Sequence, residues 1–172
     1  MTPFPLSTAE VHAFVSDAFG EDLGVKGDIT AQAVIAPTQQ LSADITAREP
    51  LVLCGIPLAI AFFRALSSDV NLEVLHNDGD YVEGHTSILH IHGPARAILA
   101  AERPALNILQ HLSGIASRTH HYVEEIKGTG AQLLDTRKTI PGYRRLAKYA
   151  TNCGGAKNHR MGLYDAILIK DN

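Results

Sequence analysis

The pattern of apolar and polar residues over the first 95 positions is typical of a small α+β unit. Ser7 and Glu10 form a capping-box pair, and the apolar residues after them recur at helical spacing. Pro57 favours the first turn of a second helix, which the pattern extends to about Leu66. Residues 27–30 are predicted to be a loop. Alternation predicts strands of an antiparallel sheet over residues 41–47, 70–74 and 88–92.

The pattern changes after residue 95. Apolar residues recur at helical spacing from Leu106 to Ile126, and Pro104 disfavours helical dihedrals in the residue before it, so a helix is predicted to begin near residue 104. A strand, a helix and a buried strand are then predicted over residues 132–135, 143–151 and 166–170. This order is typical of a parallel α/β fold. The predicted domains are residues 1–103 and 104–172.

The last predicted strand, residues 166–170, lacks the neighbouring strands and helices that would bury it. Two parallel strands cannot bury both faces or close a barrel, and they leave long unpaired edges. We therefore expect the 172-residue chain to be incomplete at its C-terminus, with the rest supplied by a longer polypeptide or by a partner.

Composition narrows the class of protein. Apolar residues make up 45% and charged residues 19%, which is typical of a globular domain. No apolar stretch approaches the roughly 18 residues of a membrane span, and no signal peptide is recognisable at the N-terminus. We therefore expect a cytoplasmic protein that binds neither membrane nor nucleic acid. Cys54 and Cys153 lie far apart in sequence, which argues against a disulfide scaffold or a zinc cage, and Cys153 is expected to pack rather than react.

Charge is distributed unevenly along the chain. Residues 1–136 contain seven Lys and Arg against sixteen Asp and Glu, whereas residues 137–172 contain eight against two. Gly, Pro, Asn and His interrupt the basic residues, which a solvated helical face does not require. The asymmetry therefore indicates a localised anion site, with a solvated basic surface as the simpler alternative.

The predicted anion site combines cations from three segments. Arg137 and Lys138 follow one predicted strand, and His159 and Arg160 precede the next, which ends at Lys170. The carboxyl ends of parallel strands converge on the ligand crevice of α/β folds. A guanidinium there can bind a carboxylate or phosphate through two parallel hydrogen bonds. So many cations in one pocket require a multiply charged anion. Unrelated surface cations are the alternative.

Arg103, His90 and His92 are further candidates for binding an anion or a metal. Arg103 is predicted at a helix start, where the helix dipole disfavours a cation, so it either reaches a neighbouring anion or pairs with an acid such as Glu102. His90 and His92 share one strand face and could ligate a metal, but no matching ligands follow. Half-exposed strand histidines are the favoured interpretation, and no metal ligand is predicted within the chain.

Five sequence blocks together resemble quinolinate phosphoribosyltransferase (decarboxylating). They are DLG and GDIT within residues 22–30, ERPALNILQHLSGIA at 102–116, DTRKTIPG at 135–142, CGGAKNHR at 153–160 and LIKDN at 168–172. The resemblance covers nearly the whole chain in family order. It implies an N-terminal α/β sandwich domain followed by the first strands of an α/β barrel.

The resemblance also implies an activity and a site. The family transfers phosphoribose from phosphoribosyl pyrophosphate to quinolinate with Mg²⁺, giving nicotinate mononucleotide, CO₂ and pyrophosphate for NAD biosynthesis. It implies quinolinate-binding roles for Arg137, Lys138, His159, Arg160 and Lys170, with Lys138 and Lys170 also catalytic. Arg103 matches an arginine that reaches the active site of the neighbouring subunit, in a dimer or a hexamer of dimers. The acids that bind Mg²⁺ are expected beyond Asn172, so the chain alone is expected to be inactive.

Two other functions remain open. A paralogue from molybdate-transport operons shares much of the pattern and acts on another heterocycle. A non-catalytic anion-binding module is the alternative of a different class. Residues 79–93 also resemble half of a lipoyl or biotinyl carrier motif, but residues 49–126 contain no lysine for attachment, which excludes a swinging-arm module.

Overall fold

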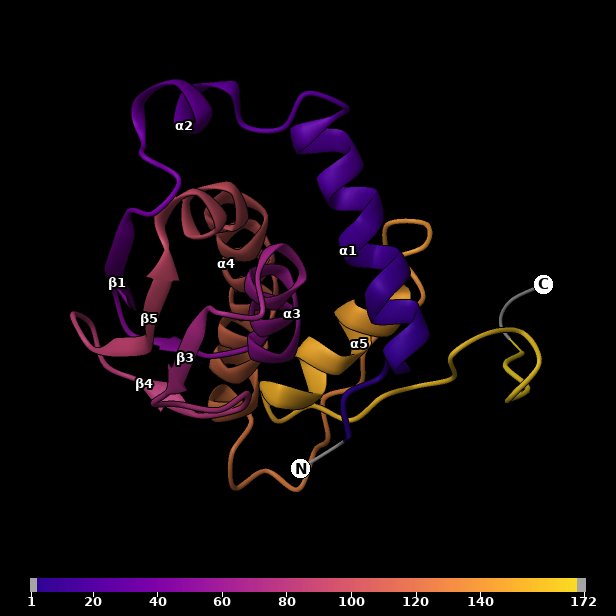
Figure 1. The fold of residues 1–172 in the computed structure, drawn as a ribbon. Helices are drawn as coiled ribbons and strands as arrows, with labels where there is room; N and C mark the ends of the chain where they lie inside the picture. Colours follow the sequence, from indigo (N-terminus) through magenta and orange to yellow (C-terminus); the bar gives the residue numbers. More distant parts are fainter. Residues whose placement is uncertain (1–2, 170–172) are drawn as a thin grey trace.

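A computed structural model describes residues 3–169, which form a mixed α/β fold (Figure 1). The elements follow one another along the chain as α1 (Thr8–Leu23), α2 (Ile29–Val34), β1 (Gln40–Thr46), β2 (Leu51–Val52), α3 (Ile56–Leu66), β3 (Asn71–Val74), β4 (Tyr81–Val82), β5 (Ser87–Pro94), α4 (Ala95–Glu125) and α5 (Arg144–Cys153). The mixed α/β class predicted from the sequence is confirmed. No described helix has both the length and the apolar character that a membrane span requires.

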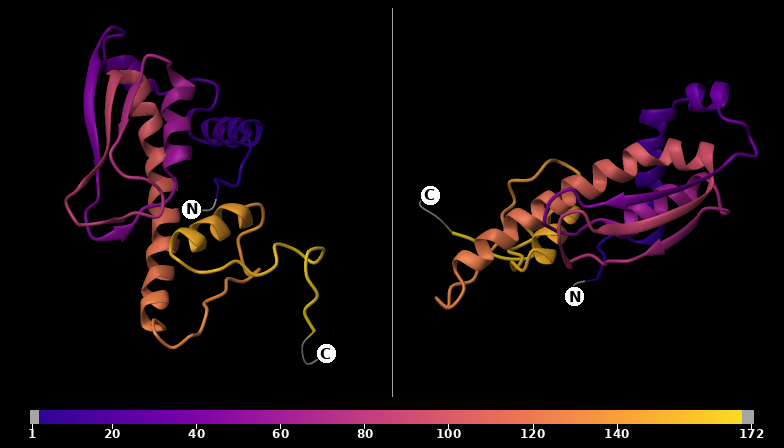
Figure 2. Two further views of the ribbon diagram at one scale, coloured as in Figure 1. Left: turned by 90° about the horizontal axis from the view of Figure 1, so that it is seen from below. Right: turned by 90° about the vertical axis from the view of Figure 1, so that its left-hand side faces the viewer.

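The sheet is antiparallel, as its alternating strands predict. Its order is β1-β5-β3, and β2 pairs with β4 in a separate two-stranded ribbon. The sheet packs on α4, α3 packs beside α4, and α1 contacts both helices (Figure 2). Phe14 and Phe19 of α1 contact the buried Phe62 of α3 edge to face. These layers make up most of the apolar core.

Local signals correctly predicted that helices begin near Ser7 and Pro57. The Ser7 side chain accepts from the Glu10 backbone, and the Glu10 carboxylate accepts from the Ser7 backbone N–H, 2.8 Å away, so the capping box is formed. The predicted loop at residues 27–30 is wrong, because α2 begins at Ile29. The Asp28 side chain caps it by accepting from the Ala31 N–H at 2.9 Å.

The predicted start of the long helix is also wrong. α4 begins at Ala95 and continues through Pro104 without interruption. Ala101, Pro104 and Ala105 are all buried, so packing on both sides of the proline outweighs its local cost to the helix. Arg103 therefore lies inside a helix rather than at its start, and the argument from the helix dipole does not apply to it.

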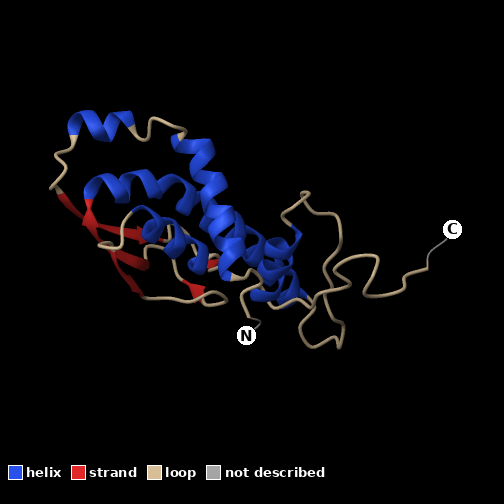
Figure 3. Cartoon of the chain, turned by 45° about the vertical axis from the view of Figure 1, so that its right-hand side comes forward, coloured by secondary structure: helices blue, strands red, loops and turns tan. Residues whose placement is uncertain are grey.

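The two predicted parallel strands differ from the structure. Residues 132–135 contribute a single parallel bridge between Leu134 and Lys157, and residues 166–169 form no strand. Ile167 and Ile169 are 91% and 84% exposed, so this segment is not buried by the described residues. A strand requires a paired neighbour, and none of the described strands lies alongside these residues. Figure 3 shows this end of the chain as loop.

Helix α5 is attached to the N-terminal layers by a buried carboxylate. Asp78 is 4% exposed and accepts from the backbone N–H groups of Gly55 and Ile56, at the start of α3. It also accepts from the hydroxyl of Tyr149 in α5 at 2.9 Å. Phe4 packs edge to face on the Tyr149 ring. One side chain thus satisfies a helix N-terminus and connects two helices that are distant in sequence.

This contact predicts a stability loss at alkaline pH. Burial raises the pKa of Tyr149 above its ordinary value of 10.0, and the Asp78 carboxylate raises it further. Because the folded-state pKa is the higher one, the stabilisation is complete below pH 10.0 and is lost as the pH rises beyond it. Chemical denaturation across this range should show a shallower decline in Tyr149→Phe than in the wild type. An equal decline of stability with pH in Tyr149→Phe and in the wild type would contradict the role of Tyr149.

The turn after α5 packs directly on α4. A Cβ atom at Gly154 would lie 2.3 Å from the Ala116 carbonyl oxygen and 2.7 Å from the Thr119 Cβ. Gly154→Ala should therefore lower the free energy of unfolding by about 1–3 kcal/mol through overpacking. Gly20→Ala is the control, because nothing lies within 4 Å of that position in α1, and it should be neutral or slightly stabilising. Equal effects of the two changes in denaturant titrations would refute this packing.

Candidate functional site

Two loop segments that carry the predicted anion ligands lie side by side. Residues 133–139 and 157–161 are joined by the bridge between Leu134 and Lys157, in which the Asp135 N–H donates to the Lys157 carbonyl at 3.1 Å. α5 lies between them in sequence and against them in space. The structure therefore brings together the Arg137 and His159 regions that the sequence treats as separate motifs.

A buried ion pair holds these segments on α5. Lys148 is 1% exposed, and its Nζ lies 2.5 Å from Oδ1 of Asp135, whose side chain is 4% exposed. The same Nζ donates to the His159 carbonyl at 3.0 Å, and the His159 N–H donates to Asp135 Oδ1 at 2.7 Å. With its amide nitrogen turned inward, Asn158 donates to Asp135 Oδ2 at 3.2 Å. Lys148 thus acts as an internal tether and is not free to bind a ligand.

Arg144 forms a second tether one helical turn earlier. Its guanidinium donates to Thr139 Oγ1 and to the Met161 carbonyl, both at 3.2 Å, and to the Arg137 carbonyl at 3.5 Å. It therefore connects the loop of Arg137 to the loop of His159. Arg144 and Lys148 together determine the position of both segments.

One guanidinium donor of Arg137 has no hydrogen-bond partner within residues 3–169. This donor is the buried Nε. A buried unpaired donor costs about 1–3 kcal/mol, and a carboxylate or phosphate oxygen would satisfy it. The neighbouring Lys138 is exposed, and its backbone N–H donates to Thr136 Oγ1 at 2.8 Å.

The segment after His159 folds into a tight turn. The Arg160 N–H donates to His159 Nδ1 at 2.7 Å, and its guanidinium donates to the Ala166 carbonyl at 2.9 Å. Asp165 accepts from the N–H groups of Gly162 and Met161, which lowers its pKa below the ordinary value. The Arg160 guanidinium therefore bonds within its own turn in this structure.

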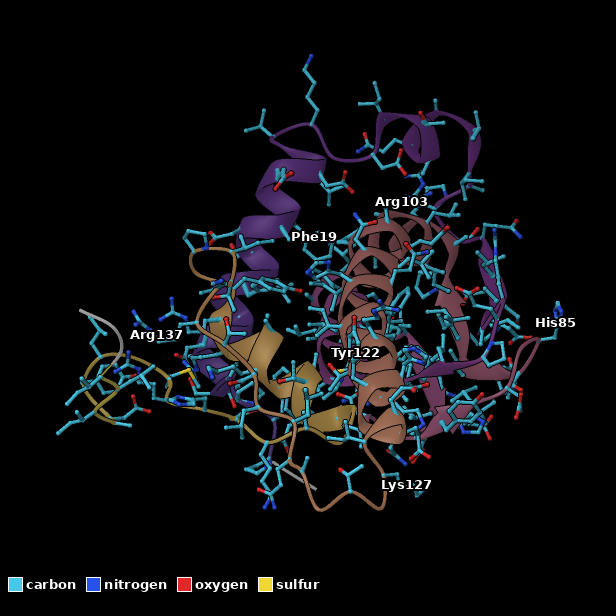
Figure 4. All side chains as sticks on the ribbon, turned by 180° about the vertical axis from the view of Figure 1, so that it is seen from behind. Phe19, His85, Arg103, Tyr122, Lys127 and Arg137 are labelled. Carbon is cyan, nitrogen blue, oxygen red and sulfur yellow. The ribbon has the colours of Figure 1, made fainter. Side chains whose placement is uncertain are left out.

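The remaining predicted ligands lie elsewhere. Arg103 is exposed on α4 and lies apart from Arg137 (Figure 4). It has no role in the cluster of the same chain. Lys170 lies outside the described residues. None of the three clefts found beside α4, with volumes of about 520, 750 and 600 Å³, is lined by Arg137, Lys138, His159 or Arg160. The described cluster thus lies on loops outside these three clefts.

Sequence reasoning missed the roles of Arg144, Lys148 and Asp135. Arg144 and Lys148 are four residues apart and share a helix face with Thr151, opposite the apolar face of Leu146 and Ala150. Such a face normally contacts solvent, but here loop residues cover it. The one available signal was Asp135, an acid two residues before Arg137.

The strand histidines have ordinary partners. His90 Nδ1 lies 2.5 Å from Asp44 Oδ1, and His92 Nδ1 lies 2.9 Å from Ser42 Oγ, both across the pair of β1 and β5. Their half-exposed position agrees with the favoured interpretation. No group of three His, Cys, Asp or Glu side chains within residues 3–169 is arranged to hold a metal ion.

Comparison with known protein families identifies the family of this chain. Residues 28–113 match the family described as quinolinate phosphoribosyl transferase, N-terminal domain, and residues 115–172 match its C-terminal domain. The chain belongs to the quinolinate phosphoribosyl transferase family.

Particular relatives agree with this assignment. The chain is 42% identical over 154 residues to the probable nicotinate-nucleotide pyrophosphorylase [carboxylating] of Bacillus subtilis, covering 90% of this chain and 53% of the relative. The Mycobacterium leprae enzyme of that name is 40% identical, with 90% and 55% covered. The solved nicotinate-nucleotide pyrophosphorylase of Francisella tularensis superposes with a TM-score of 0.91 at 39% identity, over 99% of this chain and 61% of that one. The chain thus spans about half the length of these curated relatives.

Proposed function

We propose that the protein transfers phosphoribose from phosphoribosyl pyrophosphate to quinolinate with decarboxylation, giving nicotinate mononucleotide, CO₂ and pyrophosphate. The observation that carries the proposal is the unpaired, buried Nε of Arg137 beside Lys138, on a loop tethered to the His159 segment. Quinolinate carries two carboxylates, which suit a guanidinium and neighbouring cations. The family relationship supports the same substrate.

In the proposed mechanism the cations orient the pyridine dicarboxylate. Arg137, His159 and Arg160 bind its carboxylates, and Lys138 and Lys170 add positive charge near the reacting groups. The pyridine nitrogen attacks the anomeric carbon of the ribose as the bond to pyrophosphate breaks. Decarboxylation of the adjacent carbon then releases CO₂ and leaves an electron pair on that carbon, which the positive ring nitrogen stabilises until the carbon takes up a proton. Arg144 and Lys148 act indirectly, because their donors are occupied by the loops.

The proposal assigns Arg103 to a second subunit. Its exposed position on α4, apart from Arg137, leaves it available to a neighbouring copy in a dimer or a hexamer of dimers. Mg²⁺ is expected to accompany phosphoribosyl pyrophosphate. The described residues contain no suitable ligand group, so no step is assigned to the metal. A cytoplasmic location is part of the same proposal.

The test is an assay with three acceptors. A C-terminally extended chain, and in parallel the 172-residue chain that is expected to be inactive alone, is incubated with phosphoribosyl pyrophosphate, Mg²⁺ and either quinolinate, nicotinate or another anionic heterocycle, and nucleotide and CO₂ are measured. Nicotinate mononucleotide and CO₂ from quinolinate alone are expected. Product from another heterocycle only would indicate the paralogue. Saturable quinolinate binding with no turnover, both in this 172-residue chain and in a C-terminally extended chain, would indicate a non-catalytic anion-binding module.

A further inference from the structure

Cys54 and Cys153 are 99 residues apart in sequence but adjacent in space. Their Sγ atoms lie 3.7 Å apart, and both are free thiols. Cys54 lies two residues after the end of β2, and Cys153 is the last residue of α5. The distance in sequence suggested no relation between them, but the packing of α5 on the N-terminal layers brings them into contact.

The two thiols have different environments. Cys54 is 0% exposed, whereas Cys153 is partly exposed, so a reagent from solvent reaches Cys153 first. The Cys54 S–H donates to Cys153 Sγ. This hydrogen bond lowers the pKa of Cys153 and, together with burial, raises the pKa of Cys54. Cys153 is therefore the thiol that ionises and attacks, since the thiolate is the nucleophile.

We propose that Cys153 is a modification site for low-molecular-weight disulfides such as oxidised glutathione, and that Cys54 resolves the adduct into an intramolecular disulfide. In the first step the Cys153 thiolate attacks one sulfur of the reagent, forming a mixed disulfide and releasing one thiolate. In the second step the Cys54 sulfur attacks Cys153 Sγ, the mixed disulfide breaks, and its leaving group departs as a thiol with the Cys54 proton. Two protein thiols are oxidised and one reagent disulfide is reduced to two thiols.

The geometry requires little movement for the second step. The two Sγ atoms must approach from 3.7 Å to about 2.05 Å. Rotation of both side chains about their Cα–Cβ bonds contributes to this approach. The new bond would join the end of β2 to the end of α5. It would tether the helix that carries Arg144 and Lys148, although the reaction itself depends only on the thiols.

The test treats the native protein with oxidised glutathione and maps its thiols by mass spectrometry of an unreduced digest. A peptide pair linked through Cys54 and Cys153 is expected in the wild type. Cys54→Ala should retain glutathione on Cys153, because its resolving thiol is missing. Cys153→Ala should remain largely unmodified at the buried Cys54. The oxidised wild type should also unfold at higher denaturant concentration, and dithiothreitol should reverse this shift.

Two results would overturn the proposal. One is a folded wild-type protein that yields neither the linked peptides nor glutathione on Cys153. The other is modification of Cys54 in Cys153→Ala as fast as modification of Cys153 in Cys54→Ala. The first result requires only the wild-type peptide map, so poor folding of either variant would not obscure it. The phosphoribosyl transfer assay is a separate readout, so the two proposals fail independently.

Discussion

Replacing Lys148 with Met is expected to lower the free energy of unfolding by about 3–5 kcal/mol. The substitution removes the cation from a pair that is 1% and 4% exposed and leaves the Asp135 carboxylate buried with no opposite charge. It also removes the donor to the His159 carbonyl. Denaturant titration measures this loss. A lower midpoint with an unchanged slope of free energy against denaturant concentration shows a change in stability and not in the compactness of either state.

Two controls make this result specific. Lys127→Met removes a cation from an exposed pair with Glu124 and should cost less than about 1 kcal/mol. The double variant Lys148→Met, Asp135→Leu should recover part of the loss, because no charge is left buried without a partner. A loss in Lys148→Met no larger than that in Lys127→Met would contradict the buried tether.

Replacing Arg137 with Ala is expected to weaken quinolinate binding by about 100-fold, which corresponds to about 2.7 kcal/mol. The substitution removes the unpaired guanidinium donor and its charge from the anion site. Arg137→Lys should bind with intermediate affinity, because a lysine retains the charge but cannot donate two parallel hydrogen bonds. Calorimetric titration with quinolinate, and with nicotinate as the monocarboxylate control, provides the affinities.

Lys127→Ala is the matched control for binding. Lys127 lies just after α4, outside the cluster (Figure 4), and its loss should leave the quinolinate affinity unchanged. Circular dichroism confirms that each variant is folded before titration. Equal affinities of Arg137→Ala and the wild type would remove Arg137 from the site and weaken the proposed function.

Much of the candidate site could be predicted from sequence, since the cations stand next to one another. Arg137 with Lys138 and His159 with Arg160 are adjacent pairs in motifs that resemble the family. Their binding roles stay predictions. Lys148 could not be predicted in the same way, because the pattern of α5 places it on the polar face of the helix.

The errors in the fold share one physical cause. Pro104 disfavours a helix locally, yet α4 continues because Ala101 and Ala105 are buried on either side of it. Residues 166–169 are apolar enough for a buried strand, yet no described strand pairs with them. In both cases the result depends on residues distant in sequence, and propensity alone carries too little free energy to decide it.

The sequence by itself determined the elements whose signals are local. The capping box of Ser7 and Glu10, the start of α3 near Pro57 and the alternation of β1 all depend on neighbours a few residues apart. Only the tertiary structure decided that Lys148 is an internal tether and that Cys54 contacts Cys153. Burial and proximity arise when distant segments pack together, and no periodicity along the chain records which face a loop will cover.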